Sequence, residues 1–305
     1  MPLPKECQLC NQSSKEQLVV TRHVYGDKTK ERSFFRCSAC KVIYQYPPLT
    51  QQEEEQFYLN EFESFMSSRS GEEGGWMQAE NHIKANEKTR IRRMKYLSKF
   101  IESNSRILEV GCSTGFMLWP LKESGLDCVG IEPSGVFSNF VQERGLEVYE
   151  SLEEFSNHNS DQKFDLIMHF FVLEHISRPL DFLLDQLKLL KPGGKIIFEI
   201  PNSSDPLVTV YEIPEFEKFY WSTAHPWYFN EDSTKFLLDK LSSPYEILLD
   251  QRYDLSNHLI WARDGKPGGM ERFTGILGKE LDEAYKAALI KSKMCDTIIG
   301  IISKE

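Results

Sequence analysis

The stretch Arg106-Ile-Leu-Glu-Val-Gly-Cys-Ser-Thr-Gly-Phe-Met-Leu118 decides the fold of this chain. The apolar positions at its start are typical of a buried parallel strand. Three small residues, Gly111, Ser113 and Gly115, then allow a sharp turn into a helix. A glycine-rich turn from a strand into a helix is typical of the cofactor site of a doubly wound α/β fold. The sequence therefore predicts such a fold, with a ligand at this turn.

The spacing within the turn discriminates between cofactors. The dinucleotide fingerprint requires glycine at its third and sixth places, which hold Ser113 and Phe116 when counted from Gly111. A phosphate-binding loop would end in Gly-Lys-Ser or Gly-Lys-Thr, and this turn does not. The turn resembles motif I of the class I S-adenosylmethionine (SAM) methyltransferases, with Glu109 ahead of Gly111, Ser113 and Gly115. That resemblance implies SAM as cofactor and S-adenosylhomocysteine (SAH) as product.

Strand and helix patterns alternate regularly after the turn. Phe-Asp-Leu-Ile, Leu-Glu-His and Leu-Lys-Pro-Gly-Gly-Lys-Ile-Ile, between residues 164 and 197, resemble further motifs of the same family. The resemblance implies a seven-stranded Rossmann-like sheet whose last strand runs antiparallel beside the fifth. We expect strands at 106–110, 127–131, 147–149, 164–168, 195–200, 245–249 and 297–302, and helices at 81–100, 115–124, from 179, from 230 and at 277–291.

The positions of a few side chains indicate how SAM is held. Glu132 ends the second strand, where a carboxylate can accept both ribose hydroxyls; the alternative is a solvated loop acid. In such folds the turn after the third strand, here Ser151 and Leu152, flanks the adenine. The family resemblance also implies that His169 to Phe171 lies along the methionine part of the cofactor, so His169 and Phe171 are candidate binding residues.

Four of the seven cysteines form two pairs, Cys7-x-x-Cys10 and Cys37-x-x-Cys40. Two such pairs supply the four thiolates of a tetrahedral zinc site, and four protein ligands leave no open position for catalysis. We therefore predict a structural zinc ribbon over residues 1–48, with short strands at 18–20 and 33–35; chance pairing and a redox dithiol are the alternatives. Zinc would stabilise a module too small to fold on its core alone.

We expect two further parts after the ribbon at 1–48. Residues 49–104 form a helical linker with the N-terminal helices of the core, and this linker includes a polar, acidic stretch at 51–75, expected to be a short helix followed by a loop. Residues 105–305 form the methyltransferase domain, with acceptor-site insertions at about 203–240 and 254–292.

The segment 212–229 is rich in aromatic residues and follows the fifth strand, at the edge where ligands of open α/β sheets bind. We expect its aromatic side chains to form an apolar pocket wall. His225 is its candidate catalytic base, and a structural histidine is the alternative. Glu174 and His175 are interpreted as residues that cap and orient the following helix.

The order of parts resembles bacterial sugar C-methyltransferases and related glycan methyltransferases. Their Tyr-His-Glu-His signature corresponds to Ser222-Thr-Ala-His225 here, so only the last histidine is retained. The resemblance implies methylation of a sugar, sugar nucleotide or glycan, at a hydroxyl or at carbon. The alternatives are an rRNA or tRNA methyltransferase with a zinc module and a non-catalytic SAM-binding protein. The RNA alternative is favoured by basic residues of the ribbon: Lys15, Arg22, Lys28, Lys30, Arg32, Arg36 and Lys41.

Charge and hydropathy limit the partners. Lys and Arg number 36 against 46 Asp and Glu, which gives a formal net charge of −10. This balance disfavours a polyanionic partner, so we expect a small-molecule or glycan acceptor and no nucleic acid. The chain has no apolar run long enough to span a bilayer and no signal peptide at its start. These features predict a cytoplasmic protein without a membrane span.

Overall fold

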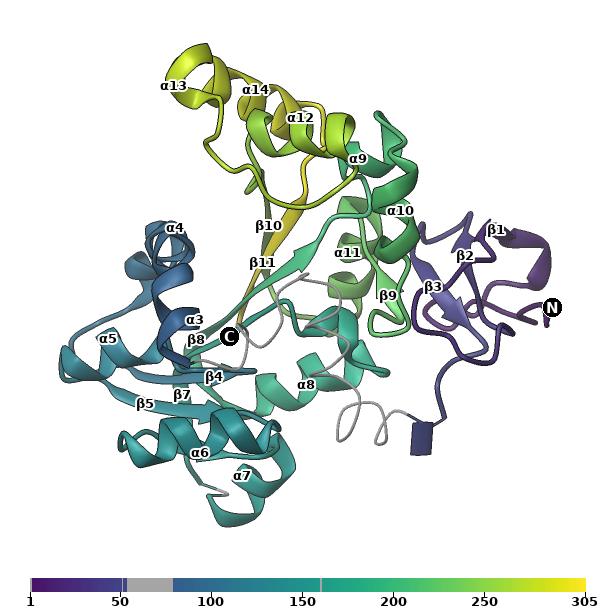
Figure 1. The fold of residues 1–305 in the computed structure, drawn as a ribbon. Coiled ribbons are helices and arrows are strands. Elements are labelled where there is room, and N and C mark those ends of the chain that lie inside the picture. Colours follow the sequence, from purple (N-terminus) through teal and green to yellow (C-terminus); the bar gives the residue numbers. More distant parts are fainter. Residues whose placement is uncertain (1, 51, 54–78, 160) are drawn as a thin grey trace.

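The structure is a computed structural model that describes residues 2–50, 52–53, 79–159 and 161–305 (Figure 1). Within these residues, seven strands form one mixed sheet in the order β10-β11-β8-β7-β4-β5-β6. Its strands are β4 (Arg106–Val110), β5 (Asp127–Ile131), β6 (Glu147–Tyr149), β7 (Phe164–Phe170), β8 (Leu190–Pro201), β10 (Tyr245–Asp250) and β11 (Thr297–Ser303). Strand β11 lies between β8 and β10 and is antiparallel to both. The predicted sheet and its antiparallel last strand are confirmed.

Alternation along the strands divides the core into two layers. Leu108 packs in one apolar cluster with residues of α7, α8 and α11, whereas Ile107 packs in the other with residues of α4, α5 and α6. Helices therefore cover both faces of the sheet, as a doubly wound fold requires. The helices of these layers are α4 (Glu87–Leu97), α5 (Leu118–Glu123), α6 (Gly135–Glu143), α7 (Leu152–His158), α8 (Pro179–Leu189) and α11 (Glu231–Leu238).

Several predicted boundaries are wrong. Strand β8 begins at Leu190 and not at residue 195. The Lys-Pro-Gly-Gly segment does not precede the strand but lies within it, as an irregular stretch of the β7–β8 pairing. The helix expected at 81–100 consists of α3 (Ala79–Ala85), α4 and the 3-10 helix η4 (Ser98–Phe100), separated at Asn86. The helix expected at 277–291 is divided into α13 (Thr274–Leu277) and α14 (Lys279–Lys291), because Gly278 has a φ of +89°. The expected helix and loop at 51–75 lie largely outside the described residues.

The N-terminal segment forms a second sheet with the order β1-β2-β3-β9. It contains η1 (Ser14–Glu16), β1 (Gln17–Thr21), β2 (Ser33–Cys37) and β3 (Ile43–Tyr46), so the two predicted ribbon strands are present and a third follows. Strand β9 (Trp227–Tyr228) belongs to the segment after β8 and pairs with β3. The ribbon is thus joined to the α/β core, and Phe35 and Tyr44 share an apolar cluster with core residues.

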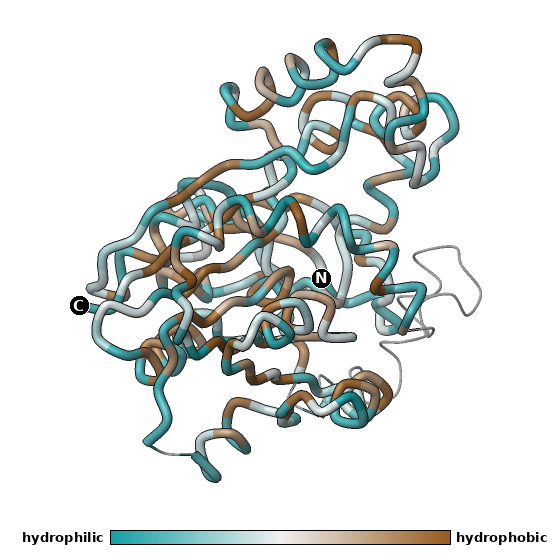
Figure 2. Tube along the Cα trace, turned by 90° about the vertical axis from the view of Figure 1, so that its left-hand side faces the viewer, coloured by the Kyte–Doolittle hydropathy of each residue, from teal (hydrophilic) through white to brown (hydrophobic). Residues whose placement is uncertain are grey.

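The segment after β8 and the C-terminal segment complete the molecule. Helices α12, α13 and α14 lie together beyond β10 and β11 (Figure 1). The remaining elements are η5 (Leu173–His175), α9 (Pro206–Thr209), α10 (Pro214–Tyr220), η6 (Asp239–Leu241) and α12 (Leu255–Asp264). Figure 2 shows hydrophobic stretches along the interior strands and hydrophilic ones at the outer loops. Among the described helices, none combines the length and apolar character that crossing a bilayer requires.

Candidate functional site

The turn after β4 adopts a backbone that favours glycine. Gly111, Ser113 and Gly115 have φ values of +73°, +50° and +71°, in the left-handed region. A Cβ atom on Gly111 would lie 2.7 Å from Cγ2 of Val172, which comes from the segment after β7. The backbone N–H groups of Gly111 and Cys112 both donate to the carbonyl of Ile131. The turn is therefore held between the carboxyl ends of β5 and β7.

Glu132 lies at the carboxyl end of β5 and binds this turn directly. Its carboxylate accepts hydrogen bonds from the backbone N–H of Ser113 at 2.6 Å and of Ser134 at 2.9 Å. The side chain is buried, and burial raises its pKa while the two backbone hydrogen bonds oppose that shift. A solvated loop acid, the alternative to a ribose ligand, is thus wrong. The carboxylate keeps lone pairs with which it can accept further hydroxyl donors.

Glu109 is a second buried acid beside the turn, on β4. Burial raises its pKa well above the ordinary value, and the nearby Glu132 charge adds to the rise while Arg93 opposes it. Among the described residues, none donates a hydrogen bond to its Oε2 atom. A buried acid with a strongly shifted pKa is typical of a functional site.

His169 of β7 and Phe171, the residue after this strand, lie in different environments. The His169 ring is fully buried, stacks on Phe198 at a centroid distance of 5.4 Å and contacts Phe182 of α8 edge-on. Burial lowers the pKa of His169 to about 3, so it is neutral. The ring packs in the core beneath α8, so a contact of His169 with the cofactor would come from its backbone, and its binding role stays a prediction. Phe171 is only partly buried and has a φ of +58°. This strained backbone is typical of functional segments.

The residues after β6 have local roles. The Ser151 hydroxyl caps α7 by accepting the backbone N–H of Glu154 at 3.0 Å. Leu152 packs against the core. Both lie next to Glu132 in the topology, because β6 is the neighbour of β5 and the Glu132 N–H donates to the Tyr149 carbonyl.

His82 of α3 also belongs to this site, although sequence reasoning did not identify it. Its Nδ1 atom lies 3.0 Å from the hydroxyl of Thr114, within the glycine turn. Its ring also contacts Phe116 and Phe137, and burial lowers its pKa. The helical pattern predicts this helix, but no local spacing relates it to a turn 32 residues away.

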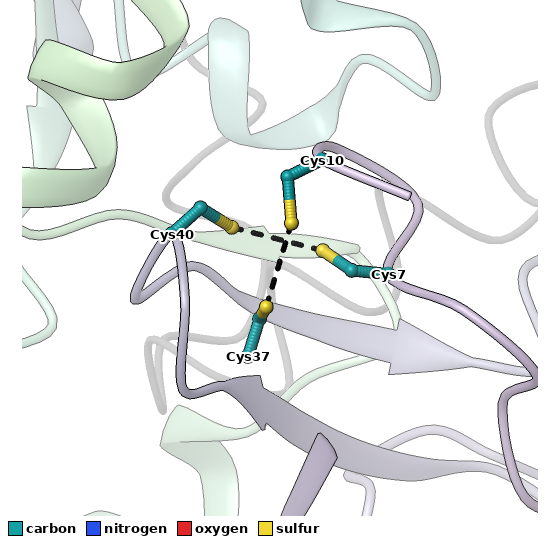
Figure 3. A group of neighbouring side chains, drawn as sticks. All are labelled: Cys7, Cys10, Cys37 and Cys40. Atoms are coloured by element: carbon teal, nitrogen blue, oxygen red, sulfur yellow. Dashed lines mark hydrogen bonds between the residues drawn. The ribbon is translucent and has the colours of Figure 1, made fainter. Parts of the chain in front are cut away.

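The four ribbon cysteines converge on one point (Figure 3). The Sγ atoms of Cys7 and Cys40 are 3.7 Å apart, and those of Cys10 and Cys37 are 3.5 Å apart. Four sulfurs bound tetrahedrally to zinc at about 2.3 Å would be roughly 3.8 Å apart. The adjacent Cys40 thiol lowers the pKa of Cys7 to about 5, which favours the thiolate that metals bind. The cysteines thus fit a zinc ion.

Most aromatic residues of the 212–229 segment pack in the interior. Tyr220, Trp221 and Tyr228 are buried, and they pack against Phe34 and Ile43 of the ribbon. Trp227 borders a small pocket with His175 and Pro226, so the predicted wall of stacked aromatic side chains is not formed by these three residues. These rings form the contact between ribbon and core, which explains why aromatic residues are dense here.

His225 lies among these residues and is buried, with its N–H donating to the Ser222 carbonyl. Its ring centroid is 4.6 Å from that of His175, with the ring planes at 87°. Glu174 belongs to the same group, and one potential ligand atom from each of the three residues lies within 4.8 Å of the others. The structure thus assembles titratable side chains that the sequence motifs leave separate.

Comparisons with known proteins place this site in a family. Residues 82–241 match the family model described as a methyltransferase domain. A tRNA U34 carboxymethyltransferase of Hydrogenovibrio crunogenus is 29% identical over 121 residues, which cover 35% of this chain and 36% of that protein. A ubiquinone biosynthesis O-methyltransferase of Maricaulis maris is 31% identical over 98 residues, covering 30% and 39%.

Solved structures agree on the fold. A SAM-dependent methyltransferase from Archaeoglobus fulgidus superimposes with a TM-score of 0.50 at 17% sequence identity, covering 80% of this chain and all of that one. The chain spans less than two thirds of the length of the curated relatives it matches. The family model begins after the ribbon, so the four-cysteine module lies outside the matched region.

Proposed function

We propose that this chain, which belongs to the methyltransferase-domain family, is a SAM-dependent methyltransferase that methylates a hydroxyl oxygen of a small acceptor of the sugar or sugar-nucleotide class. Oxygen as the methylated atom is supported by matched relatives that are named O-methyltransferases. The sugar class is supported by the order of sequence parts, from the cysteine pairs to His225.

The cofactor is proposed to lie over the turn after β4. Glu132 would accept the ribose hydroxyls, and the backbone of Gly111, Ser113 and Gly115 would approach the cofactor closely. Ser151 and Leu152 would flank the adenine, and Phe171 would lie near the methionine part. SAM supplies an electrophilic methyl group on a sulfonium, so the protein mainly aligns donor and acceptor. Glu109, buried beneath the turn, would help to hold it in place.

The observation that carries the acceptor proposal is the position of His225. Val172 packs on Gly111, and the next residues form η5, which brings His175 to His225. The segment with His225 also returns to the carboxyl end of β8, where the Ser203 N–H donates to the Phe229 carbonyl. A neutral imidazole at this edge can accept a hydroxyl proton as the carbon–oxygen bond forms.

We propose that the four cysteines bind a structural zinc ion. Their sulfur separations support this role, and full protein coordination leaves no position for a substrate. Zinc would thereby stabilise the ribbon sheet, including its pairing with β9 next to His225.

A methyl-transfer assay on a panel of sugar nucleotides tests the proposal. Zinc-loaded protein is incubated with isotopically labelled SAM, and products are identified by mass and by the methylated atom. We expect label on an acceptor oxygen, with at least a hundredfold loss in His225→Ala, because a positioned base contributes about 10²–10⁴-fold. Label on carbon or nitrogen, or an active His225→Ala enzyme, would contradict the proposal.

A tRNA acceptor is the second candidate. It is supported by relatives named tRNA U34 carboxymethyltransferases and by exposed basic residues on the ribbon: Lys15, Arg22, Lys28, Lys30, Arg36 and Lys41. These relatives leave the expectation of no nucleic-acid partner unsupported. Arg32 belongs to the same segment but is buried and paired with Asp27 and Glu53. Binding to bulk tRNA that weakens steeply with salt, and methyl transfer to it, would favour this candidate.

A further inference from the structure

Two chain segments bring three titratable side chains together at the carboxyl edge of the sheet. Glu174 and His175 end the short helix η5, and His225 comes from the loop before β9. Glu174 and His225 are buried, with 2% and 8% of their surface exposed, whereas His175 is partly exposed. Because burial removes water from these groups, their charges interact more strongly than they would at the surface.

The backbone around His225 is firmly held. The Pro226 carbonyl accepts the N–H of Gln45 in β3, and the Thr223 N–H donates to the Tyr25 carbonyl. Within the loop, the Tyr228 hydroxyl donates to the carbonyl of Tyr220 and accepts the N–H of Ser222. The ribbon therefore holds the loop on both sides of His225, so the fold fixes the distance between His225 and η5.

Aromatic and uncharged side chains lie beside the group. On its own segment, His225 faces the Tyr228 ring at a centroid distance of 5.7 Å. A small pocket beside His175 is lined by uncharged residues: Gln8, Pro48 and Leu49 of the N-terminal segment, with Ser177, Pro226 and Trp227. Glu174 and His175 are titratable groups that the fold brings within 4.8 Å of His225.

The three side chains are close enough to share a proton. The two imidazole rings meet edge to face, at 87°. One ligand atom of each residue lies within 4.8 Å of the others, so the same geometry also fits a cation, and the experiment below separates the two. Two adjacent imidazoles repel each other when both are charged, and one carboxylate balances one imidazolium. The group is thus suited to holding a single proton.

We propose that Glu174 and His175 are positioning residues that make His225 the proton acceptor of the methyl transfer. This inference rests on the proposed hydroxyl acceptor. As the bond from the acceptor oxygen to the methyl carbon forms, the sulfur–carbon bond breaks and its electron pair stays on sulfur. The hydroxyl proton moves to a nitrogen of His225. Glu174 stabilises the imidazolium, His175 holds the ring, and the proton then leaves to water.

Histidine titration by NMR tests the group without any acceptor. In Glu174→Gln, loss of the carboxylate charge should lower the pKa of His225 by about one unit or more. In His175→Asn, loss of a neighbouring imidazole that can also be charged should raise it. Glu174→Asp should restore the value toward wild type, and Asp185→Asn, which removes an exposed carboxylate on α8, should leave it unchanged. When an acceptor is known, the acidic limb of the rate profile should move in the same directions.

Opposite shifts in the two variants support the inference, because loss of fold alone would not separate them. Equal shifts, or none, would overturn it. If near-ultraviolet circular dichroism shows that Glu174→Gln does not fold, the titration of His175→Asn decides whether the inference stands. Uptake of Mn²⁺ by protein whose ribbon already holds zinc, abolished in a folded Glu174→Gln, would also overturn it in favour of a cation site. Opposite shifts of the His225 pKa without methyl transfer to any hydroxyl would support the coupling of the three side chains and refute the proposed function.

Discussion

Tyr44 of β3 lies directly opposite Trp227 of β9 in an antiparallel pair, with their ring centroids 6.1 Å apart. The next pair joins Ile43 to Tyr228. Trp227 and Tyr228 are two and three residues from His225, and the ribbon that supplies β3 also holds the four cysteines. The ribbon is therefore a structural support of the proposed acceptor side of the site, while the turn after β4 depends on β5 and β7.

Removal of zinc should consequently affect the two sides of the site differently. When zinc is chelated, or in Cys37→Ser, we expect the amide of Gln45 to lose protection from hydrogen exchange, because its partner is the Pro226 carbonyl. SAH affinity should change by less than about threefold, whereas methyl transfer should be lost. Cys128→Ser, which alters a buried thiol of β5, is the control for protection of Gln45. Unchanged protection of Gln45 after zinc release would refute the coupling.

Glu132→Ala should weaken binding of SAM and SAH by about 10–100-fold, because hydrogen bonds to a charged group contribute about 1.5–3 kcal/mol. The same change removes the acceptor of the Ser113 and Ser134 N–H groups, so the turn itself should loosen. Isothermal titration calorimetry measures the affinity, and thermal unfolding without ligand separates the loss of turn stability. Glu153→Gln, an exposed acid on α7, should behave as wild type. Wild-type affinity in Glu132→Ala would exclude the ribose role.

Gly111→Ala should be more destabilising than Gly125→Ala, although both glycines have positive φ values, of +73° and +93°. The new methyl group at 111 would lie 2.7 Å from Val172, whereas nothing lies within 4 Å of a Cβ at 125. We expect about 1–2 kcal/mol from backbone strain at 125 and more at 111. Denaturant unfolding measures both, and only Gly111→Ala should also lower SAH affinity. Equal losses would show that Val172 does not restrict the turn.

Asp205 should make the protein less stable as the pH rises toward 8. Burial, and secondarily the charge of Asp296, raise its pKa to about 7, while the N–H of Leu207 opposes the rise. Since this folded-state pKa exceeds the unfolded value of about 3.9, the stabilisation is complete below about pH 4 and lost as the pH passes 7.

Asp205→Asn retains a side-chain acceptor for the Leu207 N–H but cannot ionise. It should therefore flatten the change in unfolding free energy between pH 5 and 8, and be more stable than wild type at pH 8 by about 2–4 kcal/mol. Urea unfolding across that pH range provides the measurement. An identical slope in both proteins would mean that Asp205 is ionised in the folded state throughout.

Local sequence determined much of this protein. The apolar run before Gly111, the strand and helix alternation after it and the two Cys-x-x-Cys pairs depend on the residues within each short segment. Strand burial, helix periodicity and knuckle geometry are local properties, so the alternation of strands and helices and the convergence of the cysteines were predictable, whereas the seven-stranded sheet with its antiparallel β11 was implied by the family resemblance. Glu132 was also predictable as a residue beside the turn, because β4 and β5 are adjacent in both sequence and sheet.

Only the tertiary structure decided how the acceptor side is built. The pairing of Tyr44 with Trp227 joins segments far apart in the chain, and no local pattern distinguishes β9 from a loop. The approach of His175 to His225, and the burial of His169 beneath α8, likewise depend on which elements pack together. Each of these contacts depends on long-range packing of apolar surfaces, whose partners are chosen by the whole fold and not by neighbouring residues.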